Sequence, residues 1–398
     1  MRLKIVKAGL MTTVQDLGRY GYQKYGVPVG GAMDEFALRT ANILTGNDEN
    51  SPVLEMTLSG PVIAFQQDAL IAVCGGDLSP SIDGISLPMW RPVWIKQGSV
   101  LSFGRAVHGC RAYLAVAGGF ALPPVMDSCS TNLQAAFGGY EGRALRDGDE
   151  LPAGEPSPLA KKWMNLLREF AEQSRGKAGA SAEQDMEKAG VYLDRVREKA
   201  CEYADQQKEK KSAFADQQNK KGGPFDSGKM RSVSWEVSRM FRPRYALTGK
   251  AVVRVFAGRE FSLFDPAARE AFFQFPFTVL PQSDRMGYRL QGPVLKKGEF
   301  TEMISETVTM GTVQVPPDGQ PLILMADRQT TGGYPRIAQA AAVDLPVLAQ
   351  LKPGDTVQFQ EISFAEAEAL LLAREESMRL MKQAVKMVME RMRSDVLD

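Results

Sequence analysis

Segment 326–336 has the densest set of side chains that could do chemistry, with acidic, basic, hydroxyl and amide groups beside two glycines. It follows an apolar run, 322–325, that predicts a buried strand, so the polar groups should lie at the end of that strand. Arginine forks suit carboxylate or phosphate, and glycines allow close backbone approach and an anion-binding nest of N–H groups. We predict catalytic roles for Asp327, Arg328 and Thr330. The expected substrate-binding residues of this segment are Gln329, Thr331, Gly332, Gly333, Tyr334 and Arg336.

Other interpretations of this segment stay open. Asp327 is a candidate general base, but it would serve equally as the carboxylate that orients an arginine. The whole segment would also suit a salt-bridged turn with no ligand.

Two further clusters, 283–289 and 13–34, combine acidic and basic residues with turn glycines. An Asp–Arg structural pair is the alternative for the first. In the second, Asp34 precedes a helical pattern over 35–44 and could be its N-cap. The candidate binding residues of the two clusters are Ser283, Asp284, Arg285, Gln15, Asp16, Arg19 and Asp34.

Several classes of chemistry are disfavoured by what the chain lacks. Its only histidine, His108, excludes a multi-histidine metal site and is expected to be structural, and the four cysteines form no C-x-x-C pair, so we predict no metal. No G-x-x-x-x-G-K-[ST], G-x-G-x-x-G or G-x-S-x-G motif is present, which disfavours a self-contained NTPase, Rossmann dehydrogenase or α/β-hydrolase.

Charge and hydropathy point to a cytoplasmic protein that binds neither nucleic acid nor membrane. The chain has 48 Lys and Arg residues and 47 Asp and Glu residues, so it has no excess of positive charge with which to bind a polyanion such as nucleic acid. Residues 1–15 lack the apolar core of a signal peptide, and no stretch reaches 18 apolar residues.

The elements that must position these residues are mainly β. Short apolar runs punctuated by Gly, Pro, Asp and Asn predict strands at 69–74, 111–117, 251–256 and 321–326. Residues 59–62 resemble 291–294, and 16–20 loosely resemble 284–288. These short matches suggest a duplicated β-barrel, and the alternative is two unrelated β-rich domains. We expect domains at 1–154 and 235–364, with a charged helical insertion at 155–234 and a C-terminal helix at 365–398.

The insertion and the C-terminal helix each have an apolar stripe at heptad-like spacing. Charged residues make up 25 of the 63 positions in 159–221, so most of that segment should be solvated helix. Each stripe could pack against its own domain, or the two could pack together as an appendage. The stripes comprise Met186, Ala189, Leu193, Val196, Ala200 and Tyr203, and Met378, Met381, Val385, Val388 and Met392.

Several of these motifs together resemble one known family. They are residues 13–19, 26–28, 31–34, 283–290, 314–317 and 326–338, with the run Ala-Asp-Arg-Gln-Thr-Thr-Gly-Gly-Tyr-Pro as the most specific. They resemble the C subunit of the prokaryotic ATP-dependent 5-oxoprolinase, whose family also includes KipA and the carboxyltransferase half of urea carboxylase. The resemblance covers 1–151 and 235–359.

The resemblance implies two cyclophilin-like β-barrel domains and activity only within a complex. It implies one partner of B-subunit type with a cyclophilin-like fold, a second partner of A-subunit type, a small amide substrate, and ATP shared with those partners. Such complexes open the lactam of 5-oxoproline to glutamate. The alternatives are a biotin-dependent carboxyltransferase acting on a urea-like amide, with biotin carried by another protein because no Met-Lys-Met site exists here, and a KipA-type regulator that binds a kinase inhibitor.

One departure from the family bears on the site. Where the family usually has Ser-Arg-Ser-Thr, this chain has Cys129 between Ser128 and Ser130. Loss of that arginine would remove a bidentate anion contact if the family uses it for binding.

Overall fold

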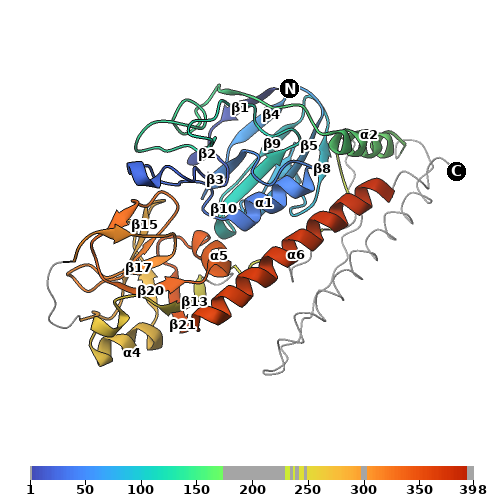
Figure 1. Cartoon of the computed structure of the whole chain (residues 1–398). Coiled ribbons are helices and arrows are strands. Elements are labelled where there is room, and N and C mark those ends of the chain that lie inside the picture. Colours follow the sequence, from blue (N-terminus) through green and yellow to red (C-terminus); the bar gives the residue numbers. More distant parts are fainter. Residues whose placement is uncertain are drawn as a thin grey trace.

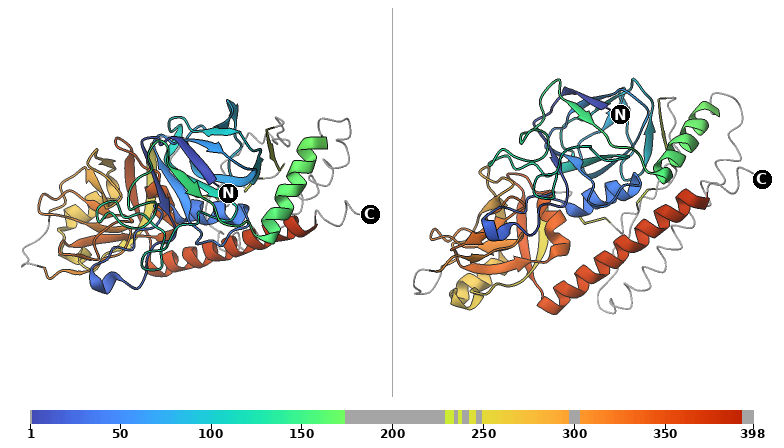
Figure 2. Two further views of the ribbon diagram at one scale, coloured as in Figure 1. Left: turned by 90° about the horizontal axis from the view of Figure 1, so that it is seen from above. Right: turned by 45° about the horizontal axis from the view of Figure 1, so that its top comes forward.

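Two β-rich units lie side by side, and one long helix runs along both of them (Figure 1). The computed structural model describes residues 2–173, 229–233, 236–237, 242–245, 249–296 and 303–391. Figure 2 gives two further views of the units and the helix.

The first unit consists of two six-stranded sheets. One sheet has the order β11(Glu150–Pro152), β1(Arg2–Lys7), β4(Val62–Phe65), β9(Val100–Ser102), β6(Ser81–Ile82), β7(Ile85–Ser86). The other has the order β12(Met230–Ser232), β8(Val93–Ile95), β5(Ala69–Asp77), β10(His108–Val116), β3(Val53–Thr57), β2(Met11–Gln15). Every pairing in both sheets is antiparallel.

Alternation along these strands builds two hydrophobic layers. The layer between the sheets takes residues such as Ile5, Ile63 and Val73, which are almost fully buried. The opposite face of the second sheet is covered by α1(Glu35–Leu44) and α2(Pro158–Gln173). Helix α1 begins where the Asp34 side chain accepts a hydrogen bond from the Ala37 N–H, so the predicted N-cap is confirmed.

The second unit is a closed seven-stranded barrel, with a two-stranded sheet and short helices beside it. Its barrel order is β13(Lys250–Ala257), β20(Arg336–Ala340), β17(Thr312–Gln314), β18(Leu322–Leu324), β15(Gly287–Gln291), β14(Phe277–Val279), β21(Thr356–Glu361). The other elements of this unit are β16(Glu306–Thr307), β19(Thr331–Gly332), α4(Pro266–Gln274), α5(Leu345–Ala349) and the 3₁₀ helices η2(Phe261–Leu263) and η3(Ala342–Asp344), whereas the 3₁₀ helix η1(Gln23–Tyr25) follows β2 in the chain. The barrel core includes the stacked rings of Phe272 and Phe359.

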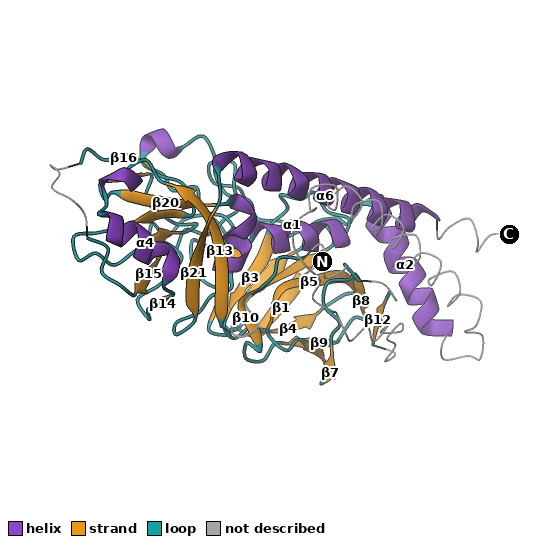
Figure 3. Cartoon of the chain, turned by 90° about the horizontal axis from the view of Figure 1, so that it is seen from below, coloured by secondary structure: helices purple, strands orange, loops and turns teal. Residues whose placement is uncertain are grey.

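Helix α6(Phe364–Arg391) joins the two units at the surface (Figure 3). Its first turns contact η3 and β13 of the barrel, where Phe364 meets Phe256 edge to face. Its later turns bury Met378, Met381 and Val385 in the same cluster as α1 and α2 of the first unit. Four residues of the C-terminal stripe, from Met378 to Val388, therefore pack against the first unit, whereas Met392 and the stripe at 186–203 lie outside the described residues.

The mainly β fold expected from the sequence is confirmed, as are helices at 35–44, at α2 and at α6. Strand β12 lies within the expected insertion 155–234 but pairs with β8, so that segment contributes an edge strand to the first unit. The short internal matches do not support a duplication, because 59–62 leads into β4 whereas 291–294 follows β15. Among the described helices, none combines the length and apolarity needed to cross a bilayer.

Replacing Met378 by alanine tests the docking of α6 on the first unit. Met378 is 2% exposed, and deletion of such a buried side chain should lower the free energy of unfolding by about 2–5 kcal/mol. Leu372→Ala on the same helix is the control, because that side chain is 65% exposed and its loss should change stability by no more than about 0.5 kcal/mol. Equal urea midpoints for the two variants would show that this face of α6 is not docked.

Candidate functional site

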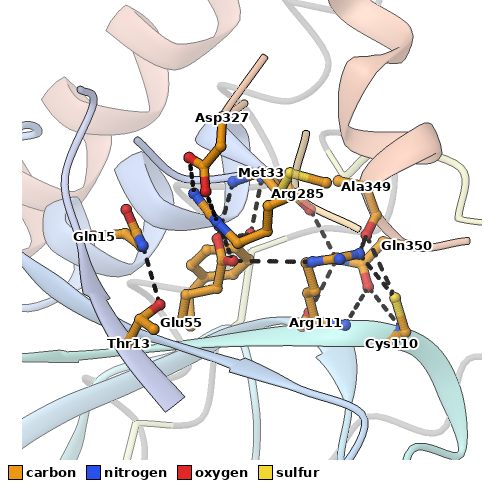
Figure 4. Close-up of polar contacts among 12 residues, drawn as sticks. Thr13, Gln15, Met33, Glu55, Cys110, Arg111, Arg285, Asp327, Ala349 and Gln350 are labelled. Atoms are coloured by element: carbon orange, nitrogen blue, oxygen red, sulfur yellow. Dashed lines mark hydrogen bonds and ion pairs between the residues drawn. The ribbon is translucent and has the colours of Figure 1, made fainter. Parts of the chain in front are cut away.

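Arg285 connects the two units through a buried bridge of charges (Figure 4). Its Nε donates to Asp327 Oδ2 at 2.8 Å and its Nη2 donates to Asp327 Oδ1 at 3.1 Å, both within the barrel unit. Its Nη1 pairs with Glu55 of strand β3, in the first unit. Burial opposes the charge on Arg285, but Asp327 and Glu55 outweigh it and raise the pKa of the guanidinium. The guanidinium therefore stays charged, and its contacts with the two carboxylates fix one unit against the other.

The second carboxylate oxygen of Glu55 also has its hydrogen-bonding capacity filled. Oε2 accepts hydrogen bonds from the Tyr113 hydroxyl and from the Met33 N–H, each at 2.9 Å. The Arg111 guanidinium lies 3.9 Å from Oε1, and Arg111 in turn donates to the Tyr288 hydroxyl across the interface. Each charge of this bridge therefore has a partner of opposite charge, which is the condition for burying it.

Asp34 adds a second connection between the units. Besides capping α1, it accepts hydrogen bonds on Oδ2 from Tyr245 at 2.6 Å and from Gln350 Nε2 at 3.0 Å. The Gln350 side-chain oxygen accepts from the N–H groups of Cys110 and Arg111 in the first unit. Burial raises the pKa of Asp34, against the effect of these hydrogen bonds. Both oxygens of Asp34 accept hydrogen bonds from the protein, and these contacts start α1 and connect the two units.

Asp16 organises the loop that contains the departure from the family pattern. Its Oδ1 accepts from the hydroxyls of Ser128 and Ser130 and from the Gly18 N–H, and its Oδ2 accepts from the Cys129 N–H. Only the backbone of Cys129 is needed for this contact, so an arginine or a cysteine would serve it equally. Burial raises the pKa of the Cys129 thiol.

Arg19 and Gln15 are buried but not saturated. Arg19 Nη2 donates to Ser130 O and its guanidinium stacks over Phe137 at 4.7 Å, yet Nη1 has no hydrogen-bond partner among the described residues. Gln15 Nε2 donates to Thr13 and to Thr131 O, while Oε1 has no partner in the same part of the chain. Buried polar atoms without a partner are rare in native proteins, so these two atoms distinguish Arg19 and Gln15 from the other buried polar residues described above.

Arg328 is half-buried and only weakly anchored. Its Nε and Nη1 reach only the carbonyls of Val308 and Met325, at 3.4 and 3.3 Å. Burial lowers its pKa, which Tyr20 and Glu35 of the first unit and Asp327 of its own unit oppose. Glu35 is solvent-exposed, yet desolvation raises its pKa.

Other predicted residues lie outside this group. Arg336 is held by Glu260 through two hydrogen bonds, at 2.7 and 2.6 Å, and by Glu306 at 2.6 Å. Asp284 caps the turn into β15 by accepting from the N–H groups of Met286 and Gly287, and Ser283 bonds the backbone of Arg289 in the same turn. These contacts are those of structural residues.

Residues 329–334 form the rim of the proposed site. Gly332 lies in strand β19, paired with Glu306, so its backbone is extended and does not make the expected nest. A side chain there would meet Gln314 Nε2 at 2.4 Å, which explains the glycine. Thr330 accepts from the Val308 N–H through its carbonyl. The exposed or half-exposed members are Gln329, Thr330, Thr331, Gly332, Gly333 and Tyr334.

Sequence reasoning missed the partners that hold the charged residues together. Glu55 is an acidic residue inside a buried strand, and Arg111 is a basic one, so each was detectable as an exception to an apolar pattern. Gln350 did not stand out in the sequence as an exception of this kind. No group of three or more His, Cys, Asp or Glu with metal-binding geometry occurs among the described residues.

Similarity to known proteins identifies the class to which this chain of two β units belongs. The family described as "Carboxyltransferase domain, subdomain A and B" matches residues 25–202 and 209–361, and the chain belongs to this family.

Individual relatives are similar over nearly the whole chain. The C subunit of 5-oxoprolinase from Escherichia coli is 36% identical over 387 residues, covering 96% of this chain and 97% of that protein. The protein of the same name from Haemophilus influenzae is 33% identical over 358 residues, 90% of each. The crystal structure of the Kluyveromyces lactis urea amidolyase superposes with a TM-score of 0.73 at 27% identity, over 95% of this chain but only 20% of that larger one.

Replacing Arg285 by methionine tests the bridge between the units. Because the change leaves Asp327 and Glu55 buried without their cation, the free energy of unfolding should fall by about 3–5 kcal/mol in urea titrations. Arg289→Met, on an exposed position of the same strand β15, is the matched control and should change stability by no more than about 0.5 kcal/mol. If Arg285→Met is as stable as this control, the bridge contributes nothing to folding.

Proposed function

We propose that this chain is the C subunit of an ATP-dependent 5-oxoprolinase-type complex that opens the lactam of 5-oxoproline to glutamate. The observation that carries the proposal is similarity along almost the full length of both chains to the C subunits of 5-oxoprolinase from two bacteria. The enzyme is a hydrolase of a cyclic amide, and it works only when its partners are bound.

The chemistry of the candidate site suits this reaction. Opening an amide passes through an anionic intermediate, and fixed cations with preorganised donors stabilise such an anion without a histidine. Arg328 has the spare hydrogen-bonding capacity to take the carboxylate of 5-oxoproline. Asp327 is held by Arg285 at a fixed position beside it, which suits a carboxylate that orients the substrate or accepts a proton. Thr330 and the exposed residues around it are the proposed rim of the site.

Partners follow from what the chain itself lacks. The sequence has no phosphate loop, so we assign ATP to a surface shared with other proteins of the complex. The proposed partners are a B-subunit-like protein of cyclophilin-like fold and an A-subunit-like protein, in a cytoplasmic heteromer.

A second candidate is a biotin-dependent carboxyltransferase component acting on a urea-like amide. The family name and the superposition on a urea amidolyase favour it. In that case biotin would arrive on another protein, and the same residues would bind urea in place of the lactam.

An omission experiment distinguishes these candidates. The chain is mixed with its two candidate partners, and ADP and glutamate are measured with 5-oxoproline and ATP as substrates. We expect turnover in the full mixture and none when any one protein, including this chain, is left out. Full activity without this chain, or turnover by this chain alone, contradicts the proposal, and consumption of urea in place of 5-oxoproline supports the second candidate.

Arg328→Lys should inactivate the assembled complex because lysine keeps the charge but loses the planar fork. The expected loss in kcat/KM is on the order of 10²-fold, about 2.7 kcal/mol. Arg336→Lys is the control, because it makes the same chemical change at another arginine of the segment. Since Arg336 is paired with Glu260 and Glu306, this substitution should lower stability more than it lowers turnover. Unchanged kcat/KM in Arg328→Lys would remove Arg328 from the site.

A further inference from the structure

A break in the ladder between β5 and β10 of the first unit receives the side chain of Gln350 from the barrel unit. The register of the two strands shifts between His108 and Ala112. At this break Gln350 Oε1 accepts from the N–H groups of Cys110 and Arg111, at 3.0 and 2.9 Å, and Gln350 Nε2 donates to the Arg111 carbonyl at 3.0 Å (Figure 4). One side-chain amide therefore bonds the bulged backbone as a neighbouring strand would.

Two glycines make room for this amide, and its surroundings fix its orientation. A Cβ built on Gly109 would lie 2.5 Å from Gln350 Oε1, and one built on Gly76 would lie 2.7 Å from the same atom. Gln350 is 2% exposed, and its Nε2 also donates to Asp34 Oδ2 at 3.0 Å. Because the oxygen faces two donors and the nitrogen faces two acceptors, only a correctly oriented amide satisfies all four contacts.

The residues that Gln350 holds are the supports of Glu55 in the ionic bridge. Arg111 Nε lies 3.9 Å from Glu55 Oε1. On the other side, the Asp34 N–H donates to the Tyr113 hydroxyl at 2.8 Å, and that hydroxyl donates to Glu55 Oε2 at 2.9 Å. Gln350 therefore reaches both oxygens of Glu55, one through Arg111 and the other through Asp34 and Tyr113.

Glu55 in turn holds Arg285, and Arg285 holds Asp327, the carboxylate proposed for the site. We propose that Gln350 is a positioning residue whose amide sets the place of Glu55 and, through Arg285, that of Asp327. Gln350 itself contacts no proposed substrate group. The inference rests on the proposed function, which assigns Asp327 to the site, and deepens it by naming a residue of the opposite face of the interface that controls Asp327.

Glutamate is the substitution that tests the orientation of this amide. It matches glutamine in shape, but its second oxygen would face Asp34 Oδ2 and the Arg111 carbonyl, where the amide presents a donor. Burial and the Asp34 carboxylate would both raise the pKa of the new carboxyl group, and a proton shared by the two acids would restore one hydrogen bond. The folded chain would then hold that proton more tightly than the unfolded chain, so the damage should shrink as the pH falls.

The two basic side chains nearest to Gln350 along its contacts and its chain are already engaged. Arg111 Nη1 is held by the Tyr288 hydroxyl and the Ala349 carbonyl, each at 2.6 Å, and Lys352 Nζ pairs with Asp355 at 3.2 Å. The other titratable groups near Gln350 are Asp34, Tyr245, Cys110 and the exposed His108.

Urea unfolding of the full-length chain, from about pH 8 to about pH 5, tests these contacts. Relative to the unmodified chain, Gln350→Glu should raise the unfolding equilibrium constant on the order of tenfold or more at the higher pH, and the excess should shrink on acidification. Gln320→Glu is the matched control, because the Gln320 amide also bonds the N–H and the carbonyl of one residue, Gly292, but within the barrel unit. Equal pH dependence in the two variants overturns the proposal.

Coupling to the bridge is the readout that a purely local role would not move. Gln350 and Arg285 share no hydrogen bond in the described part of the chain, so independent effects on stability should add. If Gln350 sets the place of Glu55, Gln350→Glu and Arg285→Met together should cost clearly less than their sum, because each alone already releases Glu55. Additive effects overturn the proposal. If Gln350→Glu does not fold, Gly76→Ala, whose methyl group would displace Gln350 Oε1, replaces it in this comparison.

Turnover by the assembled complex tests the link to Asp327. At a pH where Gln350→Glu is folded, its kcat/KM with 5-oxoproline should lie on the order of tenfold or more below that of Gln320→Glu. Adding Asp327→Asn should cause little further loss, because Gln350 acts through Asp327, and independent losses overturn the positioning role. If the complex turns over neither 5-oxoproline nor urea, the proposed function fails, while the coupling of Gln350 to Arg285 in stability still decides this inference.

Discussion

The ionic bridge from Asp327 through Arg285 to Glu55 is the interaction on which the rest of the structure depends. Taking three charges out of water is costly, and the cost is met only if each is paired in good geometry. Arg285 meets this condition by contacting a carboxylate in each unit, so the two units have one relative position in which the bridge is complete. The proposed site between them would inherit that rigidity, since Asp327 belongs to the bridge and is also a candidate residue of the site.

The polar residues of the interface fall into two groups. Asp16, Asp34 and Arg336 have all or nearly all of their hydrogen-bonding capacity occupied by the protein, and they shape loops, a helix start and a strand. Arg19 keeps an unpaired buried atom within the part of the chain that the structure describes, and Arg328 has only long contacts to carbonyls. Because native proteins satisfy nearly all buried polar groups, the second group is where a ligand is expected to complete the structure.

Local physics made much of the fold predictable from sequence. A capping aspartate followed by an apolar-periodic stretch predicts a helix start, and α1 begins at Glu35 for that reason. Apolar runs bounded by turn residues predicted β5, β10 and β13. The cluster at 326–336 was detectable because so many charged and hydroxyl side chains beside glycines is unusual. These features depend on residues a few positions apart, which a sequence displays directly.

The sequence by itself determined which residue types were available to the site, and only the tertiary structure decided which of them face it. Ser283, Asp284 and Arg285 are consecutive, yet Arg285 alone turns inward. It does so to pair with Glu55, which lies 230 positions away in the sequence. Arg336 and Arg328 looked equivalent, but the first is neutralised by Glu260, 76 positions distant. Gly30 and Arg19 of the first unit approach Asp327 of the barrel only once both units are docked. Pairings across such separations depend on packing in three dimensions, which local patterns do not encode.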